Sequence, residues 1–355
     1  MTHGGAEEII RLVAMHFIEQ GDDVHMFFLL EKRYGHWEEV KAKYPNLHLY
    51  YSSGGGKWGI FSVLRNFRSV RHITFDYSFS SIATNNGLVG LLKRLGIVHI
   101  DHVIGRESTL IFKRFKGSKL WYNKVMYRLG YPSVNTVICQ TDYMCEELLE
   151  QLPWLTKRSR VVVIPNPVDT VIMHRRAEEV VEGIEQYKPY IVACGRLHPV
   201  KAYDLLIEAF ARILKERPEL HLVILGEGPE RASLTAISEE FGIRDRVHLL
   251  GEVPNVYPYF RQAEVCAVTS HIEGFPNVLL QMMSQNERVV STTCAGGVDK
   301  IKGLITCKPS DVNALTDALC RGLTEDVTGN RALFDEELQS RSIEKFVQRA
   351  INATE

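Results

Sequence analysis

Short apolar runs rich in β-branched residues alternate with longer amphipathic segments along the whole chain. The amphipathic segments repeat their apolar positions with the period of a helix, as at residues 203–216, 229–241 and 312–323. The short runs predict strands at residues 24–30, 47–51, 72–75, 98–102, 136–140, 160–164, 190–194, 220–225, 247–249, 264–268, 288–291 and 304–306. Strands that alternate with helices predict an α/β fold of parallel sheets covered by helices, and the pattern occurs twice.

The two halves of the pattern are expected to be separate domains, because 355 residues exceed one ordinary core. Pro165-Asn166-Pro167 and a charged stretch at 174–188 lie between them. We therefore predict Rossmann-like domains at residues 1–170 and 171–335, and a last helix at 336–353 that packs on either domain, most simply back on the first. Ligands are expected in a cleft between the domains, outside the carboxyl ends of the strands.

The composition indicates which partners the chain can bind and in which compartment it is found. The net charge is −1, so no global field attracts the chain to nucleic acid, and we predict no nucleic-acid partner. The seven cysteines are scattered without a CxxC pair, which is typical of reduced thiols in a cytosol. The N-terminus has no signal sequence and no apolar run is long enough to span a bilayer. These features predict a cytoplasmic protein.

The most informative segment is Glu273-Gly274-Phe275-Pro276-Asn277-Val278-Leu279-Leu280-Gln281. It places a carboxylate in a Gly/Pro loop directly before an apolar helix. The free N–H groups at a helix start bind phosphate, which a carboxylate does not. Glu273 is therefore expected to bind something beside the phosphate, such as sugar hydroxyls. Phosphate and sugar in one pocket predict a nucleotide-sugar site.

Cys194-Gly195-Arg196-Leu197-His198-Pro199-Val200-Lys201 follows the predicted strand at 190–194. Gly195 permits a tight turn, and Arg196 and Lys201 can converge on one diphosphate. The alternative is an ordinary loop with solvated basic side chains.

Three further glycine-bearing turns follow predicted strands. Gly226 and Gly228 permit close backbone approach to a ligand, Val253 lies where a base edge can be held, and residues 294–297 offer backbone groups. Plain tight turns are the alternative for all three.

The first half offers weaker candidates. Gly4 and Gly5 precede an apolar helix, where glycines suit an anion or a sugar, although a frayed terminus is the alternative. His102 ends the predicted strand at 98–102 and is a candidate to hydrogen-bond the donor sugar. A single histidine at a strand end is also commonly structural.

Residues 106–131 combine basic and aromatic side chains with one acid, Glu107. This composition is typical of a membrane-interface surface, and we predict an anionic membrane surface as a partner. The alternative is a solvated helix face with aromatic core contacts. The members of the segment are Arg106, Phe112, Lys113, Arg114, Phe115, Lys116, Lys119, Trp121, Tyr122, Lys124, Tyr127, Arg128 and Tyr131.

The segment Val163-Ile164-Pro165-Asn166-Pro167-Val168-Asp169 precedes three of these motifs, at residues 195–201, 226–229 and 273–281. In this order the four segments together resemble the retaining GT-B glycosyltransferases of the family 4 type. The resemblance implies two Rossmann-like domains that face a cleft. It also implies transfer of a sugar from a nucleotide-sugar, most often UDP-linked, with retention and without a metal or other cofactor. The acceptor it implies is a lipid-linked or growing saccharide of a bacterial surface polysaccharide, made at the inner face of the cytoplasmic membrane.

The resemblance also implies roles for single residues. Arg196 and Lys201 bind the diphosphate, Glu273 contacts the donor sugar, and the start of the following helix meets the phosphates. The Gly-Gly pair lines the cleft, and His102 approaches the transferred sugar. No general base is assigned, because the cations stabilise the leaving diphosphate.

Two positions depart from the family pattern. Gln281 stands where a second glutamate grips the ribose, so we expect a weaker hydrogen bond there. Residues 1–3 leave no room for the strand that precedes the Gly-Gly pair, and its absence is expected to expose apolar sheet edges. A start assigned too far downstream or a natural truncation is our hypothesis for this. Both departures motivate an alternative function, a degenerate nucleotide-sugar-binding or scaffold protein. A nucleotide-sugar epimerase on the same fold has no acid/base constellation to support it.

Overall fold

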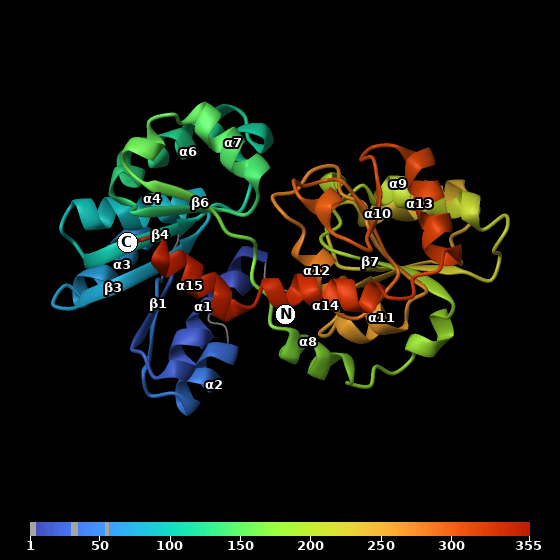
Figure 1. Cartoon of the computed structure of the whole chain (residues 1–355), viewed down its shortest axis with the longest axis horizontal. Helices are drawn as coiled ribbons and strands as arrows, with labels where there is room; N and C mark the ends of the chain where they lie inside the picture. Colours follow the sequence, from blue (N-terminus) through green and yellow to red (C-terminus); the bar gives the residue numbers. More distant parts are fainter. Residues whose placement is uncertain (1–4, 30–34, 54–56) are drawn as a thin grey trace. The chain divides into compact units, whose positions relative to one another are not determined.

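A computed structural model describes residues 5–29, 35–53 and 57–355. These residues form two compact units, which Figure 1 colours along the sequence from blue to red. The N-terminal unit holds residues 5–140, 144–167 and 343–355, and the C-terminal unit holds residues 141–143 and 168–342. Each unit has its own parallel sheets and its own apolar cores.

The C-terminal unit contains one six-stranded parallel sheet in the order β12-β11-β10-β7-β8-β9. The strands are β7 (Tyr190–Cys194), β8 (His221–Leu225), β9 (Val247–Gly251), β10 (Val265–Val268), β11 (Val289–Thr292) and β12 (Ile305–Cys307). The chain enters at β7, runs outward to β9 and returns to β10 on the other side of β7. The strand order reverses between β7 and β10, and α/β folds bind ligands at this switch point.

Both faces of this sheet are buried, which explains its continuous apolar strands. Ile191 and Ala193 of β7 share a core with one set of helices, and Tyr190 and Val192 share the opposite core with another. The first set is α9 (Tyr203–Ile213), α10 (Arg231–Glu240) and α13 (Val312–Thr324). The second set is α8 (Thr170–Ala177), α11 (Tyr257–Gln262), α12 (Asn277–Met283) and α14 (Asn330–Ser340). The predicted α/β class is therefore confirmed.

Within the described residues, the N-terminal unit has two separate parallel sheets. Four strands pair in the order β3-β4-β5-β6, and β1 pairs with β2. Their bounds are β1 (Val24–Phe28), β2 (Leu47–Tyr51), β3 (Thr74–Ser81), β4 (His99–Arg106), β5 (Thr136–Cys139) and β6 (Arg160–Val163). The helices are α1 (Gly5–Gln20), α2 (Gly35–Lys43), α3 (Lys57–Ser69), α4 (Ala83–Arg94), α5 (Ile111–Arg114), α6 (Gly117–Gly130) and α7 (Asp142–Gln151).

The single helix predicted at 336–353 is wrong, because the chain forms α14 and then α15 (Ile343–Asn352). The break lies at Arg341, whose carbonyl accepts a hydrogen bond of 2.9 Å from the amide of Val168. Helix α15 lies beside α1 in the N-terminal unit (Figure 1). Its buried side chains are Phe346, Val347 and Ala350, which share a core with Ile9 and Val13 of α1 and with Ile104, Ile138 and Ile164.

No helix in the described part of the chain is both long and apolar enough to cross a membrane.

Candidate functional site

An ion pair between Lys201 and Glu273 lies where the loops after β7 and β10 meet, at the switch point of the sheet. Lys201 Nζ is 2.6 Å from Glu273 Oε1, and the two side chains are 20% and 19% exposed. The loops themselves are joined by two hydrogen bonds. Thr269 Oγ1 donates to the carbonyl of Lys201 at 2.7 Å, and the amide of His271 donates to the carbonyl of Val200 at 2.8 Å. These hydrogen bonds hold the two loops together and so keep Lys201 close to Glu273.

Glu273 makes two further hydrogen bonds, one through its carboxylate and one through its backbone amide. Ser270 Oγ donates to Oε1 at 3.0 Å, and the amide of Glu273 donates to the carbonyl of Cys294 at 2.8 Å. Burial raises the pKa of the Cys294 thiol to about 12, and the negative charge of Glu273 adds to this. Burial also raises the pKa of Cys194, at the end of β7, to about 12, although Lys201 opposes the shift. Both thiols are therefore neutral, and the charge at this point is that of Lys201 and Glu273.

Arg196 supplies a second cation in the loop after β7. Its side chain is exposed and makes no hydrogen bond or ion pair with any described residue. Its backbone is fixed, because the amide of the neighbouring Leu197 donates to the carbonyl of Glu227 at 3.0 Å. The guanidinium therefore has all its donors available, whereas the ammonium of Lys201 is engaged by Glu273.

The glycines of this region bring neighbouring strand ends together. A Cβ added to Gly226, which has a φ of +135°, would lie 2.1 Å from the carbonyl oxygen of Gly195, and one added to Gly228 would lie 2.3 Å from that of Leu197. The amide of Gly226 also donates to the carbonyl of Gly251 at 2.7 Å. Gly226 and Gly228 therefore have a structural function of their own, whatever they also offer to a ligand.

The segment 274–281 is divided between core and surface. Phe275 and Pro276 are buried, and the guanidinium of Arg341 lies 4.7 Å from the ring centroid of Phe275. Gly274 and Asn277 are half-buried, and Asn277 begins α12. Gly274, Asn277 and Val278 therefore present part of their surface to solvent at the start of α12.

Gln281 and Val253 lie beside the same apolar core. Gln281 is half-buried on α12, and its Nε2 lies 3.5 Å from the hydroxyl of Tyr257. Val253 is half-buried and packs against this core, between β9 and α11. The C-terminal unit thus holds Gly195, Arg196, Lys201 and Glu273 in the loops after its strands, whereas Gln281 lies on α12.

The first-half candidates belong to the N-terminal unit. Gly4 lies outside the described residues, and Gly5 is exposed at the start of α1. The prediction that His102 ends a strand is wrong, because β4 continues to Arg106. His102 lies opposite Tyr77 of β3, and the two rings stack with centroids 5.5 Å apart.

Sequence reasoning missed the residues at the true end of β4, which are Arg106 and Glu107. Arg106 is buried and donates to Ser81 Oγ at 3.1 Å and to Asn166 Oδ1. The assignment of Arg106 to an exposed basic surface is therefore wrong. The signal was an Arg-Glu pair after Val103, Ile104 and Gly105, and it was hidden because the predicted strand ended at 102.

Glu107 is the centre of a buried polar network. Its carboxylate accepts hydrogen bonds from Tyr127, at 2.9 Å, and from Tyr131, and both tyrosines are fully buried. Tyr127 and Tyr131 are therefore wrong as members of an exposed surface. Burial raises the pKa of Glu107, opposed by the hydrogen bonds from Tyr131, Tyr127 and Asn86. Burial lowers the pKa of Arg106 to about 10, so the guanidinium stays charged at neutral pH.

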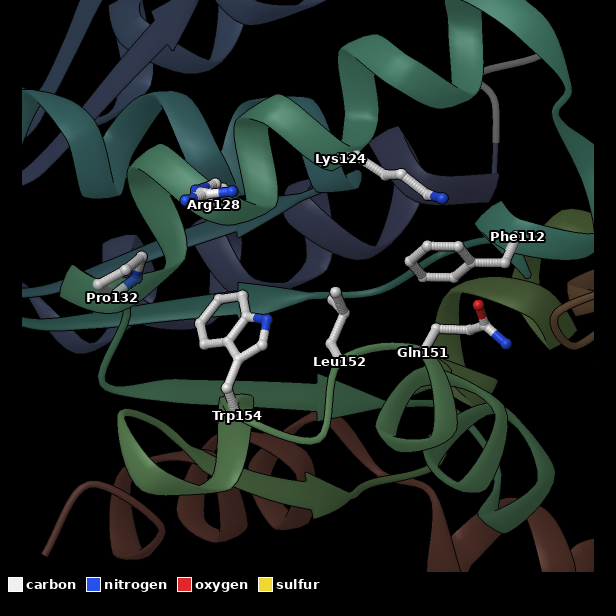
Figure 2. A pocket seen from close by; sticks show the side chains of 7 residues that line it. All are labelled: Phe112, Lys124, Arg128, Pro132, Gln151, Leu152 and Trp154. Atoms are coloured by element: carbon white, nitrogen blue, oxygen red, sulfur yellow. The ribbon is translucent and has the colours of Figure 1, made fainter.

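Of the remaining basic and aromatic residues of the segment, Phe112, Lys124 and Arg128 line a pocket (Figure 2). The pocket has a volume of about 480 Å³, and Lys124 and Arg128 of α6 lie on one side of it. Its other lining residues are Phe112, Pro132, Gln151, Leu152 and Trp154. Trp121, Tyr122 and Leu129 of α6 are 66%, 51% and 42% exposed. Aromatic and basic side chains thus share one surface of the N-terminal unit.

Both halves of the chain match family models of known proteins. Residues 3–171 match the model described as Glycosyltransferase Family 4, and residues 188–325 match the model described as Glycosyl transferases group 1.

Two relatives illustrate the sequence similarity. The N-acetylgalactosamine-N,N'-diacetylbacillosaminyl-diphospho-undecaprenol 4-alpha-N-acetylgalactosaminyltransferase of Campylobacter jejuni is 30% identical over 181 residues, 51% of this chain and 47% of that protein. The phosphatidylinositol N-acetylglucosaminyltransferase GPI3 subunit of Saccharomyces cerevisiae is 25% identical over 250 residues, 68% of this chain and 52% of that protein. The chain thus spans about half the length of these two relatives.

Among solved structures, Anabaena HepE in complex with UDP and glucose is similar with a TM-score of 0.77. The likeness covers 98% of this chain and 95% of that chain at 16% identity. It confirms the predicted fold, two Rossmann-like domains of the GT-B type.

Proposed function

The chain belongs to the GT-B glycosyltransferases of the family 4 type, and we propose that it transfers a sugar from a nucleotide-sugar to a lipid-linked or growing saccharide of a surface polysaccharide. The observation that carries this proposal is the Lys201–Glu273 ion pair at the switch point, with the exposed Arg196 in the same loop as Lys201. A nucleotide-sugar presents a diphosphate next to a neutral sugar. Two cations and one carboxylate, held at neighbouring strand ends, complement these two parts.

In the proposed mechanism, the diphosphate takes the place of Glu273 as the partner of Lys201. Arg196 then binds the same diphosphate, and its planar guanidinium suits a bidentate contact. The freed carboxylate of Glu273 accepts hydrogen bonds from the donor sugar. As the glycosidic bond breaks, negative charge grows on the diphosphate, and the two cations stabilise it without a metal. We assign no general base, and we propose that transfer retains the anomeric configuration.

UDP is the proposed nucleotide. Support comes from the similar fold of HepE, which was solved with UDP and glucose. Gln281 is half-buried on α12, and its uncharged amide can hydrogen-bond a ribose hydroxyl.

The acceptor is proposed to be lipid-linked, with the chain at the inner face of the cytoplasmic membrane. The names of both relatives contain a lipid, undecaprenol in one and phosphatidylinositol in the other. Helix α6 carries the exposed Trp121 and Tyr122 together with Lys124 and Arg128, and such aromatic and basic side chains suit an anionic membrane surface. The proposed membrane surface is thus narrower than 106–131, because Arg106, Tyr127 and Tyr131 are buried.

Thermal shift with UDP-, GDP- and dTDP-sugars tests the donor site, because a ligand that binds the native state raises the melting temperature. We expect a shift with UDP-sugars that disappears in Arg196→Ala and in Lys201→Ala. The matched control is Arg321→Ala, which removes an exposed cation paired with Glu325 on α13 and is expected to keep the shift. An unchanged shift in both site variants counts against this donor site.

The alternative is a degenerate nucleotide-sugar-binding or scaffold protein, and the uncharged Gln281 is the observation that favours it. Sugar transfer or donor hydrolysis by the wild-type chain that is lost in Glu273→Ala excludes this alternative. Donor binding without either reaction, in the presence of lipid-linked acceptors, supports it.

A further inference from the structure

Three side chains that commonly bind metal ions lie together on the small β1–β2 sheet of the N-terminal unit. They are Asp23, just before β1, His25 in β1 and His48 in β2, and their ligand atoms all lie within 4.8 Å of one another. The pairing of the strands produces this cluster. His25 and His48 are register partners, so their side chains share one face, with ring centroids 4.4 Å apart.

The hydrogen bonds of the cluster orient both imidazoles. His48 Nε2 donates to Asp23 Oδ1 at 3.0 Å, and His25 Nδ1 is 3.1 Å from the hydroxyl of Tyr50. The contact with Tyr50 leaves Nε2 of His25 as the ring nitrogen open to a metal. Histidines that bind metals usually have their second nitrogen held in this way.

We propose that Asp23, His25 and His48 form a binding site for one divalent transition-metal ion, of which Zn²⁺ is the representative. The ion takes the place of the proton between His48 and Asp23, and water completes the coordination. Two imidazoles and one carboxylate suit Zn²⁺, Co²⁺ or Ni²⁺ and do not suit Mg²⁺ or Ca²⁺, which prefer oxygen ligands alone.

The proposed site has a structural role. In the described residues, the β1–β2 pair forms no backbone ladder with the four-stranded sheet, and it depends on packing against α1 and α2. A metal held by both strands joins them more tightly, because binding to the folded sheet adds to its stability. The site belongs to the N-terminal unit, whereas Lys201 and Glu273 belong to the C-terminal unit, so it is separate from the metal-free transfer proposed above.

The test is a titration of the metal-free full chain with ZnCl₂ at pH 7.4, followed by calorimetry, with MgCl₂ as the ion that should not bind. We expect one Zn²⁺ per chain and a higher melting temperature. His25→Gln and His48→Gln should abolish the binding. Asp23→Asn should fold normally, because the side chain is 73% exposed, and it should weaken Zn²⁺ binding. Tyr50→Phe removes the hydroxyl that contacts His25, so it should weaken Zn²⁺ binding by about 10-fold or more.

The chain offers a matched control in a second histidine pair. His221 Nδ1 is 2.8 Å from His248 Nε2 in the C-terminal unit, and Arg246 occupies the remaining nitrogen of His221 at 3.1 Å. No carboxylate completes a metal cluster there within the described residues. The double variant His221→Gln/His248→Gln should therefore bind Zn²⁺ as the wild type does. No saturable binding by the wild type, or equal binding by Asp23→Asn, His25→Gln and His48→Gln, overturns the proposal.

Discussion

Lys201 and Glu273 satisfy each other's charge at the place where a diphosphate is proposed to bind. An ion pair that is only about one-fifth exposed is partly desolvated, so neither charge is well solvated alone. In the proposed mechanism, donor binding exchanges these partners, because the phosphates pair with Lys201 and the sugar hydroxyls with Glu273. Donor affinity therefore depends on both residues. The contribution of Lys201 to phosphate binding can be measured separately from that of Glu273 to sugar binding.

We predict that Glu273→Gln weakens binding of a UDP-sugar by about 10-fold, because a charge-assisted hydrogen bond to the sugar becomes a neutral one. Binding of free UDP should change much less, since UDP has no sugar at that position beyond the diphosphate. Calorimetry with UDP and with a UDP-sugar measures both affinities. An equal loss for the two ligands would show that Glu273 acts by positioning Lys201 and does not contact the sugar.

A substitution at Gly226 tests how closely the loops after β7 and β8 pack, because it adds one Cβ atom between them. We predict that Gly226→Ala destabilises the C-terminal unit by more than about 3 kcal/mol, because the new Cβ would lie 2.1 Å from a backbone oxygen. Gly242 is the matched control, since its φ of +68° is also positive but its Cβ would meet nothing within 4 Å. Gly242→Ala should cost about 1 kcal/mol from backbone strain alone. Urea unfolding measures the difference, and equal losses would contradict the contact between the loops.

At the scale of elements, β8 and β9 carry two histidines whose packing requires them to be neutral. Burial, followed by the charges of His221 and Arg244, lowers the pKa of His248 to about 4, and burial also lowers that of His221. The folded state thus disfavours protonation, whereas the unfolded chain accepts a proton near pH 6.5. The stabilising contribution is complete above pH 6.5 and is lost as the pH falls toward 4.

We predict that the urea midpoint of the C-terminal unit falls between pH 7.5 and pH 5, and that His248→Gln reduces this fall. The glutamine removes the group that takes up the proton in the unfolded state. Measuring both proteins at both pH values separates this effect from other titrations. His16→Gln, in a solvent-accessible part of α1, is the control and should leave the fall unchanged.

The bounds of the strands show which elements the sequence predicts well. Strands such as β7 and β8 were predicted closely, because a strand buried on both faces is a continuous apolar run. Strands β3 and β4 were predicted too short, at 72–75 and 98–102, because their later residues include Ser78, Ser80 and Arg106. Arg106 is buried and donates a hydrogen bond to Asn166, 60 residues away, and no local pattern reveals that partner.

In the candidate site, too, local features were predicted and contacts between distant residues were not. The sequence around Arg196, Lys201 and Glu273 predicts that they follow strands, and their side-chain types predict their chemistry. The direct pairing of Lys201 with Glu273 across 72 residues depends on strand order, which periodicity does not contain. The Glu107 network was missed for the same reason, since its partners Asn86, Tyr127 and Tyr131 lie on other elements.

At the scale of the whole molecule, the chain crosses between its units near residue 168 and again near residue 342. Helix α15 therefore completes a core whose other members come from the first half of the chain. Thr136 Oγ1 also donates to the carbonyl of Ala353 at 3.0 Å, which joins β5 to the last turn. The N-terminal unit is thus built from segments at both ends of the described chain.

We predict that Phe346→Ala destabilises the N-terminal unit by about 3–5 kcal/mol, because it leaves a cavity among Ile9, Val13 and Ile138. The C-terminal unit should keep its stability and its donor-induced thermal shift. Calorimetry should resolve the two units, with only one transition moved to lower temperature. A matched loss in both units would show that they unfold as one. Lys345→Ala, on the same helix, is the surface control.

The return of α15 to the first unit has a consequence during synthesis on the ribosome. Residues 168–342 can complete their sheet as soon as they emerge, whereas the N-terminal unit waits for residues 343–355, which are translated later. Until then the core around Ile9 and Val13 lacks Phe346, Val347 and Ala350. We therefore expect the unit that is translated first to finish folding last.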